Sequence, residues 1–179
     1  MRYLIVCGGK IDKEFGLNEI KTDGIDAIIA ADSGMDFLYE NGVTPDIIVG
    51  DFDSTTTNAL EYFERKGQTE IRRLNPIKDD TDTEYAIRLA ISEGARSIVL
   101  LGATGSRIDH VLGNISLLGI GLESGTDISI IDTNNRIRMA DKPVTIEKSA
   151  QYGRFVSLIA LTDDNEVSLK GFKYPVTDY

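Results

Sequence analysis

The chain has 179 residues, of which 41% are hydrophobic, so it can bury a core without relying on disulfides or a structural metal. Its formal net charge of −10 at pH 7 argues against a nucleic-acid-binding surface, which needs clustered basic residues. No apolar run reaches membrane-spanning length, and the start is too short in apolar residues for a signal peptide. We therefore expect a cytoplasmic protein with no membrane or nucleic-acid partner.

Short apolar runs alternate with helix-like segments up to about residue 121, which is typical of a parallel sheet flanked by helices. Helices are predicted at residues 54–66, where Gly67 follows as a stop signal, and at 82–93, where Thr81 and Glu84 form a capping box. The predicted strands are residues 3–7, 26–31, 46–49, 69–74 and 97–101.

From residue 125 the hydrophobic pattern changes to alternation, which favours antiparallel strands joined by turns. We therefore predict an α/β domain over residues 1–124, followed by a smaller all-β, sandwich-like domain over residues 125–179. The chain stops before an obvious closing strand, so we expect this second domain to lack a C-terminal portion. Its predicted strands are residues 127–131, 136–139, 144–147, 155–161 and 167–169.

Several apolar runs of the first domain end in aspartates. Asp32 follows the run at 26–31, Asp51 and Asp53 follow the run at 46–49, and Asp80 and Asp82 lie in the motif Lys-Asp-Asp-Thr-Asp at 78–82, where the helix at 82–93 begins. Because the carboxyl ends of parallel strands share one edge of a sheet, these side chains should converge on one crevice. Clustered carboxylates repel one another unless a cation neutralises them, and a site with oxygen ligands alone suits Mg²⁺.

Each acidic motif also has a plainer interpretation. The Asp-x-Asp at 51–53 can be an acidic turn in which Ser54 caps a helix. The same pattern occurs in haloacid-dehalogenase-like phosphatases, whose first aspartate is a nucleophile, and in metal-dependent glycosyltransferases. Asp-Ser-Gly at 32–34 is ordinary turn chemistry, and residues 78–82 can be a solvated acidic loop. All three loops end strands on the same predicted edge, and this coincidence favours a functional site.

The strand at 97–101 leads into a glycine-rich loop, Gly-Ala-Thr-Gly-Ser-Arg-Ile-Asp-His at 102–110. The loop offers backbone amides, the hydroxyls of Thr104 and Ser106, and the Arg107 guanidinium, which can bind phosphate through two hydrogen bonds. It lacks the Gly-Lys-Ser/Thr ending of a P-loop and the spacing of the dinucleotide motif. Asp109 can orient Arg107 or cap the next helix, and His110 is more often a hydrogen-bonded helix residue than a catalyst.

Taken together, these motifs resemble those of the bacterial thiamin pyrophosphokinases. The match rests on Ala-Asp-Ser-Gly at 31–34, Pro-Asp-Ile-Ile-Val-Gly-Asp-Phe-Asp-Ser at 45–54, Asp-Thr-Asp at 80–82, and Gly-Ala-Thr-Gly-x-Arg-Ile-Asp-His at 102–110. The resemblance implies transfer of a pyrophosphoryl group from ATP to the hydroxyl of thiamin, which gives thiamin diphosphate and AMP. It also implies a homodimer, with thiamin between the α/β domain of one subunit and the β domain of the other.

The site residues that we predict fall into three overlapping sets. The predicted Mg²⁺ ligands are Asp32, Asp51, Asp53 and Asp82, and the predicted catalytic residues are Asp51, Asp53, Asp82 and Arg107. The predicted contacts with ATP are Asp32, Ser33, Lys78, Asp80, Thr81, Gly102, Thr104, Gly105, Ser106, Arg107 and Asp109. The family's usual C-terminal Ser-Asn segment is missing from this sequence, so thiamin contacts stay unassigned. Two alternatives remain: a magnesium-dependent phosphohydrolase with Asp51 as nucleophile, and a noncatalytic nucleotide sensor.

Overall fold

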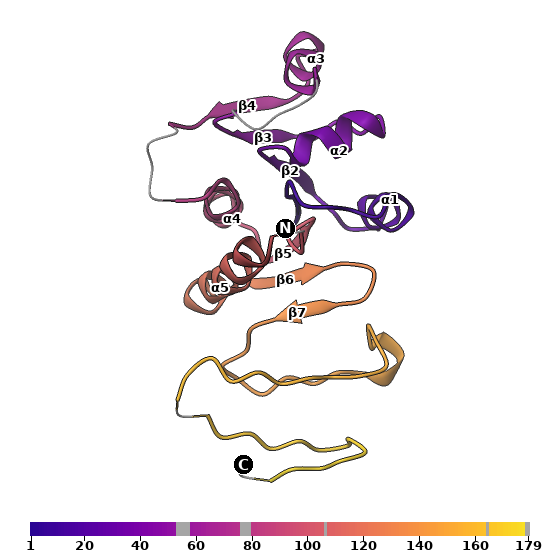
Figure 1. Cartoon of the computed structure of the whole chain (residues 1–179), viewed down its shortest axis with the longest axis vertical. Helices are drawn as coiled ribbons and strands as arrows, with labels where there is room; N and C mark the ends of the chain where they lie inside the picture. Colours follow the sequence, from indigo (N-terminus) through magenta and orange to yellow (C-terminus); the bar gives the residue numbers. More distant parts are fainter. Residues whose placement is uncertain (53–57, 76–79, 106, 164, 178–179) are drawn as a thin grey trace.

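One mixed sheet carries the N-terminal three quarters of the chain (Figure 1). In the computed structural model, which describes residues 1–52, 58–75, 80–105, 107–163 and 165–177, the strand order is β4-β3-β2-β1-β5-β6-β7. Strands β1 to β6 pair in parallel, and β7 is antiparallel to β6. The strands are β1 (Arg2–Val6), β2 (Ala27–Ala31), β3 (Ile47–Gly50), β4 (Glu70–Arg73), β5 (Ser97–Leu101), β6 (Asp127–Ile131) and β7 (Arg136–Arg138).

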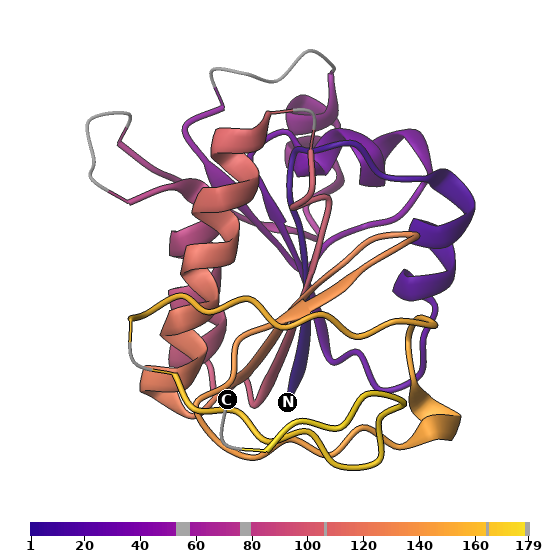
Figure 2. The ribbon, with the colours of Figure 1, turned by 60° about the horizontal axis from the view of Figure 1, so that its bottom comes forward.

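Helices cover both faces of the sheet, which explains why its strands are apolar on both sides. Along β1, Tyr3 and Ile5 belong to the cluster packed by α4 and α5, whereas Leu4 and Val6 belong to the cluster packed by α2 and α3. Figure 2 shows α4 and α5 on one side of the sheet and α1 and α2 on the other. The helices are α1 (Lys13–Ile20), α2 (Gly34–Glu40), α3 (Ala59–Lys66), α4 (Asp82–Ser92), α5 (Ile108–Ser124) and the 3₁₀ turn η1 (Lys148–Ala150).

The order of the strands creates a switch point beside β1. The chain runs from β1 outward to β4, returns through α4, and continues as β5 on the other side of β1. Connections after β1 and β5 therefore lead away from each other, which opens a crevice at the carboxyl ends of these strands. This is the edge where the sequence analysis places its candidate site.

The strands predicted for the α/β part and the helix predicted at 82–93 are confirmed within one residue at each end. Thr81 caps α4, its hydroxyl accepting a hydrogen bond from the Glu84 amide at 3.1 Å. Gly67 ends α3 with a left-handed φ of 63°. The first residues of the helix predicted at 54–66 lie outside the described residues, and α3 is seen from Ala59. Cys7 is 3% exposed and lies in the core, as its apolar surroundings indicate.

Two predicted strands after residue 125 belong to the main sheet. We expected residues 127–131 to open an antiparallel second domain, but β6 pairs in parallel with β5, and β7 follows as the edge strand. The sheet thus reaches beyond the predicted boundary at residue 125. The cause of the error is Ser129, which is 3% exposed. A small polar residue inside a strand buried on both faces gives an alternating sequence pattern that is normally typical of a half-exposed strand.

Other predicted strands are wrong in the described structure. Residues 144–147, 155–161 and 167–169 form no strand there, although Leu169 and Val176 make an isolated antiparallel bridge. Below β7 the chain continues in extended passes (Figure 1). Phe155 is 81% exposed and Ile159 is 82% exposed. Alternating side chains favour an extended backbone, but a strand also needs a neighbour that supplies the ladder of hydrogen bonds. Among the described residues, no helix is long and apolar enough to cross a membrane.

Candidate active site

Three aspartates from separate parts of the chain meet at the carboxyl edge of the sheet. Asp32 follows β2, Asp51 follows β3, and Asp82 is the first residue of α4. One carboxylate oxygen of each lies within 4.8 Å of the other two, and all three residues are partly buried. The sequence analysis expected these residues to converge. Asp53, predicted as a fourth member, lies outside the described residues, as do Lys78 and Ser106.

The loop after β2 is held tightly against the neighbouring strands. Asp32 adopts a left-handed backbone conformation, with φ 48°, and its amide donates to the Val49 carbonyl at 2.7 Å. Aspartate tolerates this conformation better than most residues, because its short side chain can hydrogen-bond locally. Two residues later, a Cβ on Gly34 would lie 1.9 Å from the Val6 carbonyl oxygen. Gly34 therefore lets α2 start directly against β1, and this start fixes the direction of the Asp32 loop.

The loop after β3 makes a similar sharp turn. Phe52 also has a positive φ, 64°, and the Arg73 guanidinium lies 5.4 Å from the centre of its ring. Its ring is among the partly buried groups that pack against the α2–α3 side of the core. A non-glycine residue in this region of backbone space costs about 1 kcal/mol or more, so the packing of the ring has to hold it there. The turn directs Asp51 toward Asp32.

The start of α4 brings backbone amides to the same place. Thr81, the residue before Asp82, caps the helix, and Asp80 lies exposed just before it. The free amides and positive dipole end of an 11-residue helix favour an anion beside them. Thr83 donates a hydrogen bond to the Cys7 sulfur at 3.7 Å, which fixes the first turn of α4 to the end of β1. Burial raises the pKa of Cys7 to about 11, so this thiol is a structural partner and not a nucleophile.

The glycine-rich loop after β5 packs against the loop after β1. Gly102 has φ 74°, and its carbonyl accepts a hydrogen bond from the Gly9 amide at 2.9 Å. A Cβ on Gly9 would lie 2.3 Å from that oxygen and 3.0 Å from the Cα of Gly105. The Asn114 amide group donates to the Ala103 carbonyl at 2.9 Å, which anchors the loop to α5. These contacts leave no room for a side chain at Gly9.

Gly8 and Gly9 were not among the predicted site residues. A Cβ on Gly8 would lie 2.1 Å from the Ser33 hydroxyl oxygen, so the β1 loop touches the aspartate side of the crevice as well as the glycine-rich side. The signal in the sequence was the Gly-Gly pair directly after the first apolar run. It is a weak signal on its own, because turns use glycine for many reasons.

Arg107 and Asp109 form an exposed ion pair at the start of α5. The guanidinium donates to the two carboxylate oxygens, at 2.6 Å and 3.2 Å. Arg107 occupies the position before the helix, but its side chain makes no capping hydrogen bond. The hydrogen bond from Arg107 lowers the pKa of Asp109 to about 2. Of the two roles considered for Asp109, the structure thus favours orienting Arg107. His110 is exposed on the helix surface.

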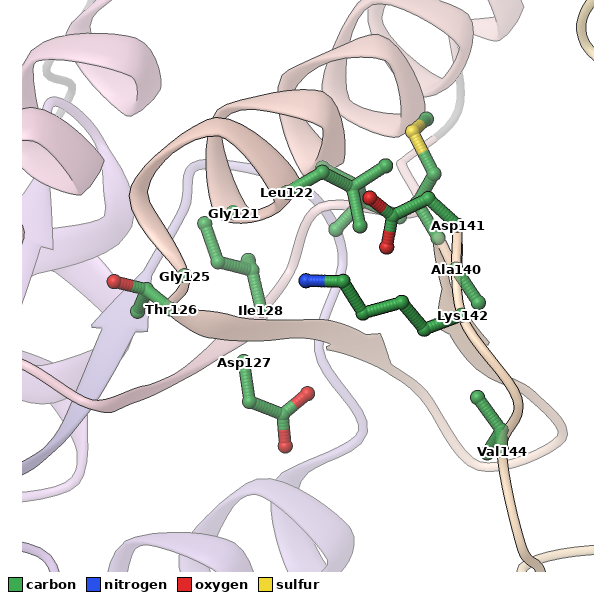
Figure 3. Close-up of a pocket in the computed structure, with 12 residues that line it drawn as sticks. Gly121, Leu122, Gly125, Thr126, Asp127, Ile128, Ala140, Asp141, Lys142 and Val144 are labelled. Atoms are coloured by element: carbon green, nitrogen blue, oxygen red, sulfur yellow. The ribbon is translucent and has the colours of Figure 1, made fainter.

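A cleft of about 430 Å³ opens between the β1 loop, the glycine-rich loop and the end of β6. Its walls include Lys10, Thr104, Gly105 and Asp132. Another hollow, of about 220 Å³, lies under the C-terminal end of α5, where the Lys142 side chain reaches toward Ile128 (Figure 3). It is lined by the first residues of β6 and therefore lies at the opposite edge of the sheet from the three aspartates.

Comparison with known proteins decides the family. The family model for the catalytic domain of thiamin pyrophosphokinase matches residues 21–130, and the model for its vitamin B1 binding domain matches residues 143–179. This chain belongs to the thiamin pyrophosphokinase family. The catalytic-domain match of the thiamin pyrophosphokinase model spans Asp32, Asp51 and Asp82, and it includes all of β6 except its last residue.

Several thiamin pyrophosphokinases resemble this chain in sequence and in structure. Thiamine pyrophosphokinase of Bacillus subtilis is 36% identical over 152 residues, which cover 84% of this chain and 70% of the relative. The crystal structure of the Bacillus subtilis protein superposes with a TM-score of 0.66 at 31% identity, covering 77% of this chain and 63% of that one. Thiamin pyrophosphokinase from Geobacillus thermodenitrificans gives a TM-score of 0.63 at 31% identity, covering 76% of this chain and 61% of that one. The chain thus spans less than two thirds of these two solved structures.

Proposed function

We propose that this chain transfers a pyrophosphoryl group from ATP to the hydroxyl of thiamin, producing thiamin diphosphate and AMP. The observation that carries the proposal is the cluster of Asp32, Asp51 and Asp82 beside the glycine-rich loop, in a chain of this family. An acidic cluster next to a phosphate-binding loop suits a substrate that arrives as a metal complex. The two alternatives from the sequence, a phosphohydrolase and a nucleotide sensor, are outcomes of the test below.

The donor set fits Mg²⁺. Three carboxylates within 4.8 Å of one another offer oxygen ligands only, which is the chemistry that Mg²⁺ prefers. Asp32, Asp51 and Asp82 would hold the ion, and we keep Asp53 as a proposed fourth ligand. When bound, Mg²⁺ supplies positive charge that neutralises the carboxylates and the triphosphate of ATP.

The protein's own groups then position the phosphates and stabilise their charge. Amides at the start of α4 and in the loop 102–105 would offer hydrogen-bond donors to an anion from positions that are set before it binds. Arg107 offers a planar guanidinium that can bind two phosphate oxygens, and Asp109 holds it until a phosphate competes for it. The remaining predicted contacts, Ser33, Lys78, Asp80, Thr81 and Ser106, stay part of the proposed ATP site. No residue is assigned as general base, because a metal-bound carboxylate is a poor one.

The acceptor and the assembly are also proposals. The chain carries a net charge of −10, and this favours approach of the cationic thiazolium of thiamin. We propose a cytoplasmic homodimer in which residues 143–179, matched by the vitamin B1 binding model, contribute to the thiamin site of the partner. The exposed apolar residues of this segment, such as Phe155 and Ile159, agree with a surface that is covered in an assembly.

The test is incubation of the full chain with ATP, Mg²⁺ and thiamin, followed by separation of the nucleotides and thiamin esters. We expect AMP and thiamin diphosphate in equal amounts, and neither product when EDTA is present. Release of inorganic phosphate without AMP would support the hydrolase instead. Binding of Mg-ATP without any product would support the sensor.

A further inference from the structure

Arg73 lies beside the loop that carries Asp51, at the carboxyl edge of the sheet, and none of the three predicted sets contains it. It is the last residue of β4, the edge strand next to β3 (Figure 1). In the parallel register of these strands Arg73 is the partner of Gly50, the residue directly before Asp51. The next amide, that of Leu74, donates to the Gly50 carbonyl at 2.9 Å. The backbone of Arg73 is thus fixed beside the point where the chain turns toward the three aspartates.

The side chain of Arg73 connects that turn to helix α3. Its guanidinium lies 5.4 Å from the centre of the Phe52 ring and donates to a Glu64 carboxylate oxygen at 2.5 Å. The ring itself lies against Gly50, since a Cβ on Gly50 would be 3.1 Å and 3.2 Å from two of the ring carbons. A chain of contacts therefore runs from the end of β3 through the ring and the guanidinium to α3.

Phe52 needs this support because of its backbone. Its φ of 64° lies in a region that a bulky side chain rarely adopts, and such a conformation persists only where the surroundings hold it. Packing against the α2–α3 side of the core supplies part of the support. A cation over an aromatic ring adds an attraction of its own. The ion pair between Arg73 and Glu64 contributes little stability, because the two side chains are 59% and 42% exposed, but it holds the guanidinium in place.

We propose that Arg73 is a positioning residue for the metal site: by its contact with the Phe52 ring it holds the turn after β3, and this turn directs the Asp51 carboxylate toward the other two aspartates. The inference rests on the proposed function, because it takes the three aspartates as the Mg²⁺ ligands. The effect of Arg73 passes through Phe52, so removing either side chain should have the same consequence.

The positive charge of Arg73 predicts the opposite effect on metal affinity. A guanidinium near an acidic cluster opposes the binding of a second cation there, so the loss of its charge alone would tighten metal binding. Loss of the positioning role weakens metal binding instead, because Asp51 then has to be ordered when the ion arrives. The sign of the change in affinity therefore separates positioning from simple electrostatics.

The experiment compares variants of the full chain with the wild type. Arg73→Gln removes the cation, Arg73→Lys keeps one, and Phe52→Leu removes the ring. Arg65→Gln is the matched control, because it removes a guanidinium that is also ion-paired on the surface of α3, with Glu61 at 3.9 Å. For each variant we measure the Kd for Mn²⁺ alone by EPR, since Mn²⁺ takes the same oxygen ligands as Mg²⁺. Amide exchange of residues 50–52 in EDTA and the Mg²⁺ concentration for half-maximal activity are measured as well.

We expect Arg73→Gln and Phe52→Leu each to weaken Mn²⁺ binding about fivefold, which corresponds to roughly 1 kcal/mol for a contact between a cation and a ring. Amide exchange in the turn should speed up even without metal. Half-maximal activity should need more Mg²⁺, and excess Mg²⁺ should restore turnover. The double variant should lose no more than the weaker-binding single variant. Arg73→Lys should stay within about twofold of the wild type, because an ammonium group also interacts with a ring face. Arg65→Gln should match the wild type.

Several results would overturn the inference: Mn²⁺ binding that is unchanged or tighter in Arg73→Gln, losses that multiply in the double variant, or Arg65→Gln reproducing the effect of Arg73→Gln. A KM for ATP that rises in Arg73→Gln at constant Kd for Mn²⁺ would also overturn it, since Arg73 would then contact the nucleotide itself.

Failure of the proposed function looks different. In that case the wild type binds Mn²⁺ but makes no thiamin diphosphate, and the Kd and exchange data still decide the role of Arg73. A wild type that binds no Mn²⁺ would reject the proposed metal site and this inference together.

Discussion

Replacing Asp51 by Asn is the most direct test of the proposed metal site. The change keeps the shape of the side chain and removes one of three charges whose oxygens lie within 4.8 Å of one another. At this separation, two unit charges repel by about 1 kcal/mol in water-like surroundings and about 3 kcal/mol at an effective dielectric constant of about 20. Asp51 takes part in two such pairs, but it is partly exposed and has other partners, which reduce the gain. We expect the metal-free variant to be as stable as the wild type or about 1 kcal/mol more stable.

The assay is thermal unfolding of both proteins in EDTA and in a series of Mg²⁺ concentrations, together with turnover. For a chain of 179 residues, 1 kcal/mol corresponds to about 2–4 °C in midpoint, so the variant should melt at the same temperature in EDTA or a few degrees higher. Mg²⁺ at about 100 times its Kd stabilises the native state by about 2.7 kcal/mol, and this increase should disappear in the variant together with activity.

Asp23→Asn is a matched control, because it removes the same charge from an exposed turn between α1 and β2, at the opposite edge of the sheet. This control should keep both the response to Mg²⁺ and the activity. A midpoint in EDTA that falls by several degrees in Asp51→Asn would show that Asp51 is structural. Retained turnover would remove it from the site.

Three further predictions test the phosphate loop and the packing around it. Arg107→Lys should raise the KM for ATP about tenfold, because the ammonium group cannot bind two phosphate oxygens in one plane, and unchanged kinetics would exclude Arg107. The pKa of Asp109 is about 2 in the folded state, below its unfolded value near 3.9. The ion pair with Arg107 therefore stabilises the protein above pH ~4, and this stabilisation is lost between pH ~4 and ~2. A titration of the Asp109 carboxyl by NMR with a midpoint near 4 would contradict the pair. Gly34→Ala should destabilise the protein by several kcal/mol in denaturant unfolding, since the added Cβ would lie 1.9 Å from a carbonyl oxygen. Gly113→Ala is the control: its Cβ would meet no atom within 4 Å, so this change should be neutral or stabilising.

The sequence was sufficient for the α/β part because each strand there carries its own signal. Runs such as residues 97–101 are apolar throughout, which indicates burial on both faces and hence a parallel sheet. Because parallel strands point the same way, the loops that follow them lie on the same edge of the sheet. Aspartates separated by up to about 50 residues could therefore be expected to meet there. The meeting of Asp32, Asp51 and Asp82 follows from topology alone and needs no knowledge of side-chain contacts.

The sequence was insufficient where a residue's environment is decided by a distant partner. Ser129 is polar and buried, so the pattern around it suggested an exposed face and an antiparallel strand, whereas β6 pairs in parallel with β5. Residues 155–161 show the reverse case. Their pattern favours a strand, but pairing depends on a neighbour that the pattern cannot specify.

The arrangement around β1 explains why the two halves of the site can work together. The aspartates lie on the β2–β3 side of β1, and the glycine-rich loop lies on the β5–β6 side. Gly8 touches Ser33 on the first side, and Gly9 touches Gly102 and Gly105 on the second. A side chain at Gly9 would push the glycine-rich loop away, because its Cβ would lie 2.3 Å from the backbone oxygen of Gly102. At Gly8 the near atom is the Ser33 hydroxyl oxygen, at 2.1 Å, and this side chain can rotate aside. A phosphate bound by both halves tolerates little such displacement, since its binding depends on donors at hydrogen-bond distance. Gly9 therefore sets how closely the loop after β1 approaches the glycine-rich loop.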